Sequence, residues 1–378
     1  MPISHHIHSD IVLKRKHSGH YNVQLLIPML LLIGIGIVMV YSASSTLAHE
    51  HFNGEYYFLK KQAFFAFIGI IVLIGFKNFP YTYFTYLTYP LIILSLVFIT
   101  AIEIPGLGVE VNGASRWLNL GILTFQPAEF ARFVLVIYLA YSMSKKENSI
   151  KSFSIGFLPH FILLVLFALL FLHQPDFGSI IIFGALTWIM LFVGGVPIMH
   201  LLSPLPFLSG LLFVLMNQKP YIIDRFMGFL DPWKYASDEG YQLVHSFMAF
   251  GSGGLFGAGF GQSYQKLFYL PEPHTDFIIA VIGEEMGFIG VIFIITLFVV
   301  ILHGGIRIAL RSDEPFGSLL AMGLTTALAL QLFVNLGVAL GLLPTKGLTL
   351  PFLSYGGTSL LISMASVGIL LNIEEAAT

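Results

Sequence analysis

Long apolar segments follow one another along almost the whole sequence. A helix that crosses a bilayer needs about 20 mostly apolar residues, and inside a bilayer only helices and closed barrels satisfy their own backbone polar groups. About ten segments meet this length: 23–45, 60–77, 82–102, 126–144, 154–172, 177–194, 197–216, 276–303, 316–341 and 351–372. Only 10% of the residues are charged, whereas soluble domains carry roughly 25%. We predict an all-α integral membrane protein, a polytopic bundle of about ten transmembrane helices.

The basic residues of the short loops predict the orientation of this bundle. Lysine and arginine are enriched in short cytoplasmic loops, and placing both chain ends in the cytoplasm gives that side the larger share. The expected parts are a cytoplasmic tail, a single membrane domain and a second cytoplasmic tail: 1–21, 22–373 and 374–378. Three outer loops, the longest of them between the seventh and eighth helices, are expected to form the active face: 103–125, 217–275 and 342–350. Loops this long in a compact protein are usually functional.

The charge balance and the lack of cysteine exclude several classes of function. A net charge of −2 leaves no basic excess for binding nucleic acid. Without cysteine there is no disulfide, no thiolate metal site and no cysteine nucleophile. The glycine-rich run 251–261 resembles a dinucleotide-binding loop in spacing, but it lacks the preceding strand and the downstream acid. Its glycines are better explained by a close approach of the backbone to the membrane surface or to a ligand.

A polar run ends the longest outer loop. Pro271 and Pro273 cannot lie inside a regular helix, so the eighth helix should begin at about Thr275, with Thr275 or Asp276 as its N-cap. One interpretation makes Asp276 a capping residue only. A second interpretation makes it a catalytic base, since burial and the helix dipole compete over the pKa of a carboxyl in this place.

Several outer residues are candidates for contacts with an anionic substrate. Arg116 could hold a phosphate or a lipid headgroup, and Trp117 could stack on a sugar or lie in the aromatic belt of the membrane interface. Lys266 and Lys346 would complete an anion site if their loops meet. Glu272 and His274 lie at two-residue steps from Asp276 and leave a divalent cation, Mg²⁺ or Mn²⁺, open as a cofactor, although one short run supplies few ligands.

Charged residues also occur within the apolar segments. Glu129 and Arg132 share a helix face at i and i+3, so they either pair structurally or serve a function inside the membrane. Asp176 begins the sixth segment and raises the same two alternatives. Of the adjacent Glu284 and Glu285, one must point away from its neighbour, so both cannot line one cavity wall.

An ordered set of motifs resembles the SEDS family of polytopic membrane proteins (FtsW, RodA and SpoVE). The resemblance covers nearly the whole chain from the first apolar segment onward. Its motifs are Gly113-Ala-Ser-Arg-Trp-Leu118, Phe125-Gln-Pro-Ala-Glu129, Phe229-Leu-Asp-Pro-Trp233, Gly240-Tyr-Gln242, the run from Gly251 to Lys266, Tyr269-Leu-Pro-Glu-Pro-His-Thr-Asp-Phe-Ile278, Gly283-Glu-Glu285 and the run from Gly341 to Gly357. The Pro-Thr-Lys-Gly-Leu-Thr form of the last loop is more similar to the division branch, FtsW, or to its sporulation relative than to RodA. His245 and Lys61 depart from the family's usual residues without touching these motifs.

This resemblance implies a ten-helix peptidoglycan glycosyltransferase. Such an enzyme polymerises lipid II at the outer face of a bacterial cytoplasmic membrane, at the division septum, by inverting transfer. Asp276 falls on the family's catalytic aspartate, Trp117 on its functional tryptophan, and Lys266 and Lys346 on its essential lysines. Further residues in and beside these motifs are expected to contact the substrate or its diphosphate: Arg116, Ser263, Gln265, Glu272, His274 and Thr275.

The resemblance also implies partners, and more than one function remains open. The expected partners are lipid II, an undecaprenyl-diphosphate-linked glycan, a class B penicillin-binding transpeptidase of the FtsI type and further divisome proteins. A lipid II flippase would instead use a polar path through the membrane along Glu129, Arg132, Asp176 and Glu285. The chain could also be the elongation or sporulation version of the polymerase, or a non-catalytic scaffold for a transpeptidase.

Overall fold

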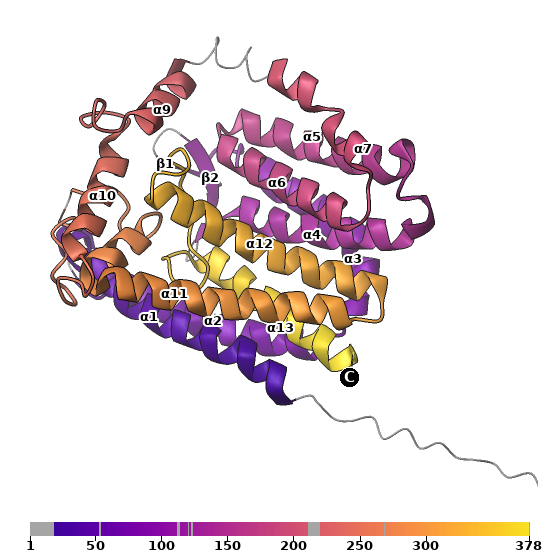
Figure 1. The fold of residues 1–378 in the computed structure, drawn as a ribbon, viewed down its shortest axis with the longest axis horizontal. Helices are drawn as coiled ribbons and strands as arrows, with labels where there is room; N and C mark the ends of the chain where they lie inside the picture. The colour runs from indigo at the N-terminus through magenta and orange to yellow at the C-terminus, as the bar shows by residue number, and fades with distance from the viewer. Residues whose placement is uncertain are drawn as a thin grey trace, which may run out of the picture.

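Helices make up most of the chain in the computed structural model, which describes residues 19–377 except 53, 112–113, 120, 122–123, 211–219 and 268. The helices, labelled as in Figure 1, are α1 (Gly19–Phe52), α2 (Tyr57–Asn78), α3 (Phe84–Ala101), α4 (Pro127–Lys145), α5 (Leu158–His173), α6 (Phe177–Val193), α7 (Ile198–Leu202), α9 (Pro220–Leu230), α10 (Tyr241–Gly253), α11 (Ile278–Arg311), α12 (Pro315–Ala339) and α13 (Gly357–Ala377). Short helical turns at Tyr81–Tyr83, Glu147–Ser149 and Phe153–Phe157 join some of them.

The described helices confirm a multi-pass membrane protein with about ten spanning segments. Seven are long and apolar enough to cross a membrane: Val23–Phe52, Tyr57–Asn78, Tyr81–Ala101, Phe153–His173, Ile278–Arg311, Pro315–Ala339 and Gly357–Ala377. Two shorter apolar helices, Phe177–Val193 and Ile198–Gly210, follow the same pattern. The remaining predicted segment is α4, which has 19 residues and carries Glu129 and Arg132. Most of α4 is buried, because α3, α6, α12 and α13 surround it.

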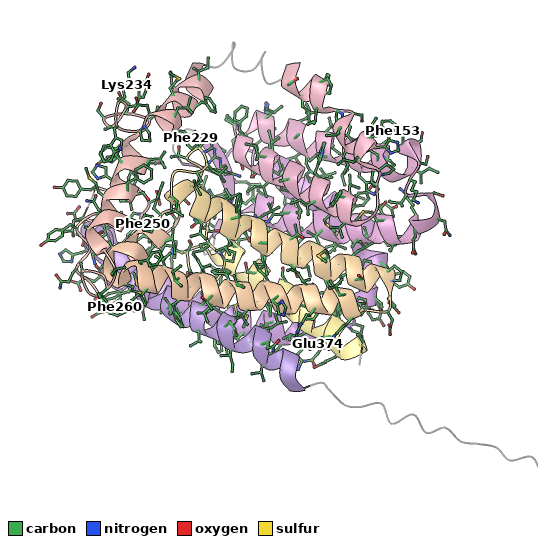
Figure 2. All side chains as sticks on the ribbon, viewed as in Figure 1. Phe153, Phe229, Lys234, Phe250, Phe260 and Glu374 are labelled. Carbon is green, nitrogen blue, oxygen red and sulfur yellow. The ribbon has the colours of Figure 1, made fainter. Side chains whose placement is uncertain are left out.

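The long helices lie side by side, and the two ends of the bundle differ (Figure 1). The start of α1 and the end of α13 lie at the same end, as an even number of spans requires. The opposite end carries α9, α10 and the strands, and Figure 2 shows Lys234 and Phe260 there, far from Glu374. The N-terminal tail expected at 1–21 lies, up to residue 18, outside the described residues.

A small antiparallel sheet departs from the all-α expectation. It consists of β1 (Gly108–Val111), β2 (Ala114–Asn119) and β3 (Thr124–Phe125), in that order. Trp117 pairs with Val109 on one side, and Leu118 pairs with Phe125 on the opposite side. The outer loop expected at 103–125 is therefore a folded platform, held to the bundle where the Gln126 amide donates to Thr358 Oγ1 at 3.1 Å.

The predicted start of the eighth helix is wrong, and helices occupy parts of the chain that were expected to be a loop or a tail. Helix α11 begins at Ile278 with Phe277 in the N-cap position, and no side chain caps it. The amides of Thr275 and Asp276 bond instead to the Glu272 carbonyl, each at 3.2 Å, in a turn that precedes the helix. The longest outer loop holds two helices, α9 and α10, and α13 runs through most of the expected C-terminal tail.

Candidate active site

Asp276 lies in a turn that α12 and the loop between α12 and α13 hold in place. Three consecutive carbonyl groups of this turn accept hydrogen bonds from that region. The bonds are Tyr355 N to His274 O at 2.9 Å, Ser354 Oγ to Thr275 O at 2.6 Å and Asn335 Nδ2 to Asp276 O at 2.9 Å. Asn335 also donates to the Leu348 carbonyl at 2.7 Å. The backbone on both sides of Asp276 is thus joined to the loop that contains Lys346.

The Asp276 carboxyl faces this loop at close range. A Cβ atom built on Gly347 would lie 2.7 Å from Asp276 Oδ2, so only glycine leaves the carboxyl its present place. Burial, and after it the charge of Glu272, raises the pKa of Asp276 to about 7, against the opposing effects of Arg116 and Lys346. A carboxyl with this pKa can accept a proton at neutral pH, as a general base must.

A polar cavity lies on the far side of Gly347. It is lined by Arg116, Gln126, Ala128, Glu129, Arg132, Asp176, Ser179, Ile182, Phe183, Lys346, Gly347 and Leu348. The Nζ atom of Lys346 is buried and has no hydrogen-bond partner. Burial lowers the pKa of Lys346 to about 7. A buried ammonium without a partner is costly, which fits a group that an anionic ligand completes.

Helix α6 aims the Lys346 side chain. A Cβ atom on Gly178 would collide with Lys346 Cε, so the aliphatic stem crosses the first turn of α6 where no side chain intervenes. Asp176 caps the same helix and accepts the Ser179 amide at 3.2 Å. Its carboxylate is the largest charge that raises the pKa of Lys346. The first turn of α6 therefore places the Lys346 ammonium, and the Asp176 carboxylate favours its charged form.

Arg116 and Trp117, two residues predicted to contact the substrate, lie in β2. Arg116 Nη2 donates to the Pro175 carbonyl at 3.0 Å, beside Asp176, and the buried Arg116 Nε has no partner. The guanidinium lines the cavity and lowers the pKa of Asp276. The structure thus brings Arg116, Lys346 and Asp276 together. Trp117 is partly buried next to Arg116 in the same strand.

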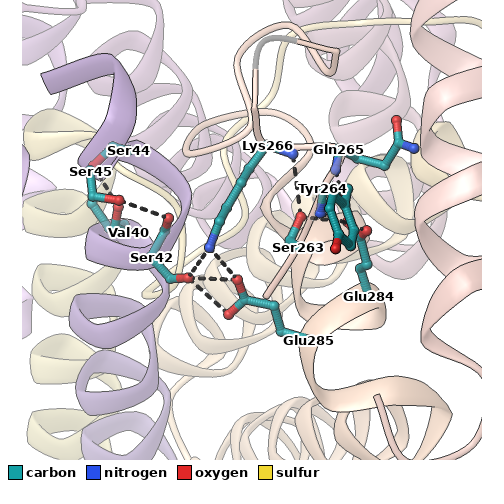
Figure 3. A network of polar contacts seen from close by, with 10 residues as sticks. All are labelled: Val40, Ser42, Ser44, Ser45, Ser263, Tyr264, Gln265, Lys266, Glu284 and Glu285. Carbon is teal, nitrogen blue, oxygen red and sulfur yellow. Dashed lines mark hydrogen bonds and ion pairs between the residues drawn. The ribbon is translucent and has the colours of Figure 1, made fainter. Parts of the chain in front are cut away.

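Lys266 belongs to a different cluster (Figure 3). Its Nζ atom lies 2.7 Å from Glu285 Oε1 and 3.0 Å from Ser42 Oγ, and Ser42 donates to both Glu285 oxygens. Lys266 does not line the cavity that holds Lys346, so the structure does not bring these two lysines into one anion site. Nothing in the sequence pointed to Ser42, because a serine in an apolar helix is common and its partner Glu285 is 243 positions away.

The adjacent glutamates point to different partners, as their spacing predicts. Glu284 accepts hydrogen bonds from Ser263 Oγ, from the Tyr264 amide at 2.9 Å and from the Gln265 amide at 3.3 Å. The Gln265 side chain extends away and meets His245 Nδ1 at 2.7 Å. Ser263 and Gln265 are therefore part of the loop's own framework.

The glycine-rich run packs closely against α11, a contact within the protein that the sequence did not predict. The amides of Ala258 and Gly259 donate to the carbonyls of Glu284 and Glu285 at 2.9 and 3.1 Å. The Phe288 amide donates back to Gly254 at 2.9 Å, next to Gly287, where a φ of 67° breaks the helix. A Cβ on Gly257 would collide with the Glu285 carbonyl. The run thus satisfies backbone groups that the break in α11 exposes.

Around Asp276 the described residues do not offer a set of three metal-binding side chains. No group of three or more His, Asp or Glu side chains gathers anywhere in the part of the chain that the structure describes. His274 is buried between the rings of Phe58 and Tyr355, with centroids 4.6 and 5.6 Å away, and burial lowers its pKa to about 4. Glu272 is exposed and accepts the Thr275 hydroxyl at 3.2 Å.

The charges inside α4 neutralise each other. Arg132 forms an ion pair with Glu129, and Gln331 of α12 adds a 3.4 Å contact to the same carboxylate. Both side chains are buried. Both also line the cavity of Lys346.

Known proteins are similar to this chain along almost its whole length. Residues 23–378 match the FtsW/RodA/SpoVE family, described as "Cell cycle protein". A protein of Geobacter metallireducens, named "Probable peptidoglycan glycosyltransferase FtsW", is 41% identical over 362 residues, 96% of either chain. "Stage V sporulation protein E" of Bacillus subtilis is 41% identical over 354 residues, 93% of this chain and 96% of its own length.

Solved structures share the fold. A chain from "Structural coordination of polymerization and crosslinking by a peptidoglycan synthase complex" has a TM-score of 0.75 at 28% identity and covers 92% of this chain and 97% of its own. The rod shape determining protein RodA of Thermus thermophilus has a TM-score of 0.66 at 28% identity. The match covers 94% of this chain and 97% of the RodA chain. Together with the motifs and the matched residues, these likenesses show that the chain belongs to the FtsW/RodA/SpoVE family of polytopic membrane proteins.

Proposed function

We propose that this protein is a peptidoglycan glycosyltransferase that polymerises lipid II at the outer face of the cytoplasmic membrane. The observation that carries the proposal is the pairing of a partly buried acid and a buried, unpaired lysine across Gly347. The names of the relatives, "peptidoglycan glycosyltransferase FtsW", support the reaction class. Their FtsW naming also supports a role in septal synthesis during division.

In the proposed reaction Asp276 acts as general base. Its carboxylate takes the proton of the acceptor sugar's 4-hydroxyl, and that oxygen attacks the anomeric carbon of the donor glycan with inversion. The bond to undecaprenyl diphosphate breaks, and the leaving group takes the electron pair. Lys346 and Arg116 offset the developing charge, which positioned cations do best in a site that excludes water. Trp117, beside Arg116, is suited to stacking on a sugar ring.

A partner follows from the same comparison. The similar solved chain is described within "a peptidoglycan synthase complex" that coordinates polymerisation and crosslinking. We therefore include a class B penicillin-binding transpeptidase of the FtsI type in the proposal, together with further divisome proteins. The glycan made by this chain would be its substrate.

The test is polymerisation of lipid II by purified protein, with and without the transpeptidase, while a β-lactam blocks crosslinking. We expect glycan ladders from the wild type and a loss of at least about 100-fold in Asp276→Asn, the range of general-base catalysis. A fully active Asp276→Asn would contradict the assignment. If the wild type forms no glycan in any combination, the result would favour the alternative that the protein is a lipid II flippase. That alternative would be tested by lipid II transport in vesicles with Glu129→Gln and Arg132→Gln.

A further inference from the structure

Lys266 is already neutralised within the protein. Its side chain is 6% exposed and that of Glu285 is fully buried, and the two meet at 2.7 Å. Ser42 closes the triangle by donating to Glu285 at 2.6 and 2.9 Å and accepting from Lys266 at 3.0 Å (Figure 3). A substrate phosphate would have to displace a carboxylate in direct contact. The geometry therefore favours a role for Lys266 that does not involve phosphate.

The triangle fastens one short segment to two helices. Ser42 belongs to α1, Glu285 belongs to α11, and Lys266 comes from the loop between α10 and α11. Next to it, Glu284 holds residues 263–265 of the same loop through the Ser263 hydroxyl and two backbone amides. Both carboxylates of the doublet thus clamp the loop at residues 263–266.

The clamped segment leads directly to Asp276. The Leu270 amide bonds to the Gln265 carbonyl at 2.8 Å, and Pro271 and Pro273 stiffen the residues that follow. The Glu272 carbonyl then accepts the Asp276 amide at 3.2 Å. A backbone hydrogen bond and two prolines therefore restrain described residues between the triangle and the Asp276 turn, so a change at one end can affect the opposite end.

We propose that Lys266, Glu285 and Ser42 form a latch that holds segment 263–276 against α1 and α11 and thereby positions Asp276. In this view Lys266 is a positioning residue that acts through Glu285 and does not contact the substrate diphosphate. The inference rests on the proposed function for its activity readout, but its structural readout is independent of any reaction.

The experiment is a double-mutant cycle with Lys266→Met, Glu285→Gln and the pair together. Each protein is purified by size exclusion, assayed for kcat and KM with lipid II, and measured by amide hydrogen exchange over residues 263–276. Lys266→Met leaves a buried carboxylate without its cation, so we expect about tenfold faster exchange of the segment and a kcat about tenfold lower, with KM within about twofold. The pair removes both charges, and both readouts should return to within about threefold of the wild type.

Two further variants keep the test decisive. Ser42→Ala removes one link without stranding a charge, so it should loosen the segment by a smaller factor even if Lys266→Met does not fold. Lys234→Met, at an exposed lysine of the same outer region, should leave exchange and turnover unchanged. The proposal is overturned if the paired variant is as impaired as Lys266→Met, or if KM rises while exchange is unaltered. If the wild type shows no polymerisation at all, the proposed function fails, and the exchange rates still decide the latch.

Discussion

Two lysines near the same end of the bundle lie in opposite electrostatic situations. Lys266 is in contact with a carboxylate and a hydroxyl, whereas the buried Nζ atom of Lys346 has no hydrogen-bond partner. Buried polar groups are almost always paired, and an exception requires an explanation. The Lys266 cluster has its charge paired within the protein and is suited to stabilising the fold. Lys346 lies near Asp276 without a hydrogen-bond partner and is suited to binding an anion.

The largest expected effect distinguishes these two clusters by their response to paired substitutions. Lys346→Met should lower the turnover of lipid II by about 100-fold, comparable to the loss of one donor that stabilises a transition-state charge. The pair Lys346→Met with Asp176→Asn should be no more active, because removing the neighbouring carboxylate does not replace the charge that the substrate meets. This result would contrast with the recovery expected for Lys266 and Glu285. Recovery in the Lys346 pair would show instead that Lys346 only balances Asp176.

The pH dependence of turnover is a second way to separate the clusters. The pKa of Asp276 is raised to about 7, so below that pH the carboxyl binds a proton and cannot accept another. The pKa of Lys346 is lowered to about 7, so above that pH the ammonium becomes neutral. Turnover should therefore be bell-shaped and narrow, with a maximum near pH 7 and a fall of about tenfold per unit on either side.

Asp176→Asn supplies the control for that profile. Because the Asp176 carboxylate raises the pKa of Lys346, its loss should move only the alkaline limb, and toward lower pH. The charged groups around Lys346 are Arg116 from β2, Glu129 and Arg132 from α4, Asp176 from α6, and Asp276 from the turn before α11. A flat profile between pH 6 and 8 would show that neither Asp276 nor Lys346 titrates during the reaction.

The sequence predicted the bundle better than the site. Apolar length was enough to locate the spanning segments, because a bilayer permits few alternative structures. The alternating pattern of β2 was too short to be recognised between long apolar segments. The N-cap at Thr275 or Asp276 was wrong because the turn closed by Glu272 places the helix start at Ile278.

Within the candidate site, motif and chemistry predicted Asp276, Arg116 and Lys346, which the structure places near one another, but the sequence did not distinguish Lys346 from Lys266. Both lysines follow a polar residue in an outer loop. Which of them meets a carboxylate depends on contacts between residues far apart in the chain, such as Ser42 with Glu285. The same holds for Asn335, whose two hydrogen bonds join the Asp276 turn to the last loop.

The smallest expected effect concerns His274, which lies two residues from Asp276. Its ring is packed between Phe58 and Tyr355, its Nδ1 has no hydrogen-bond partner, and its pKa is lowered to about 4 by burial, so it is neutral at pH 7. Phenylalanine has a similar shape and places no polar atom in this apolar site. His274→Phe should therefore retain turnover within about threefold and melt at the same or a higher temperature, since an unpaired buried polar atom is removed. If His274 bound a divalent cation with Glu272, the same substitution would abolish a metal-dependent activity, and added Mg²⁺ or Mn²⁺ would shift the melting temperature of the wild type but not of the variant.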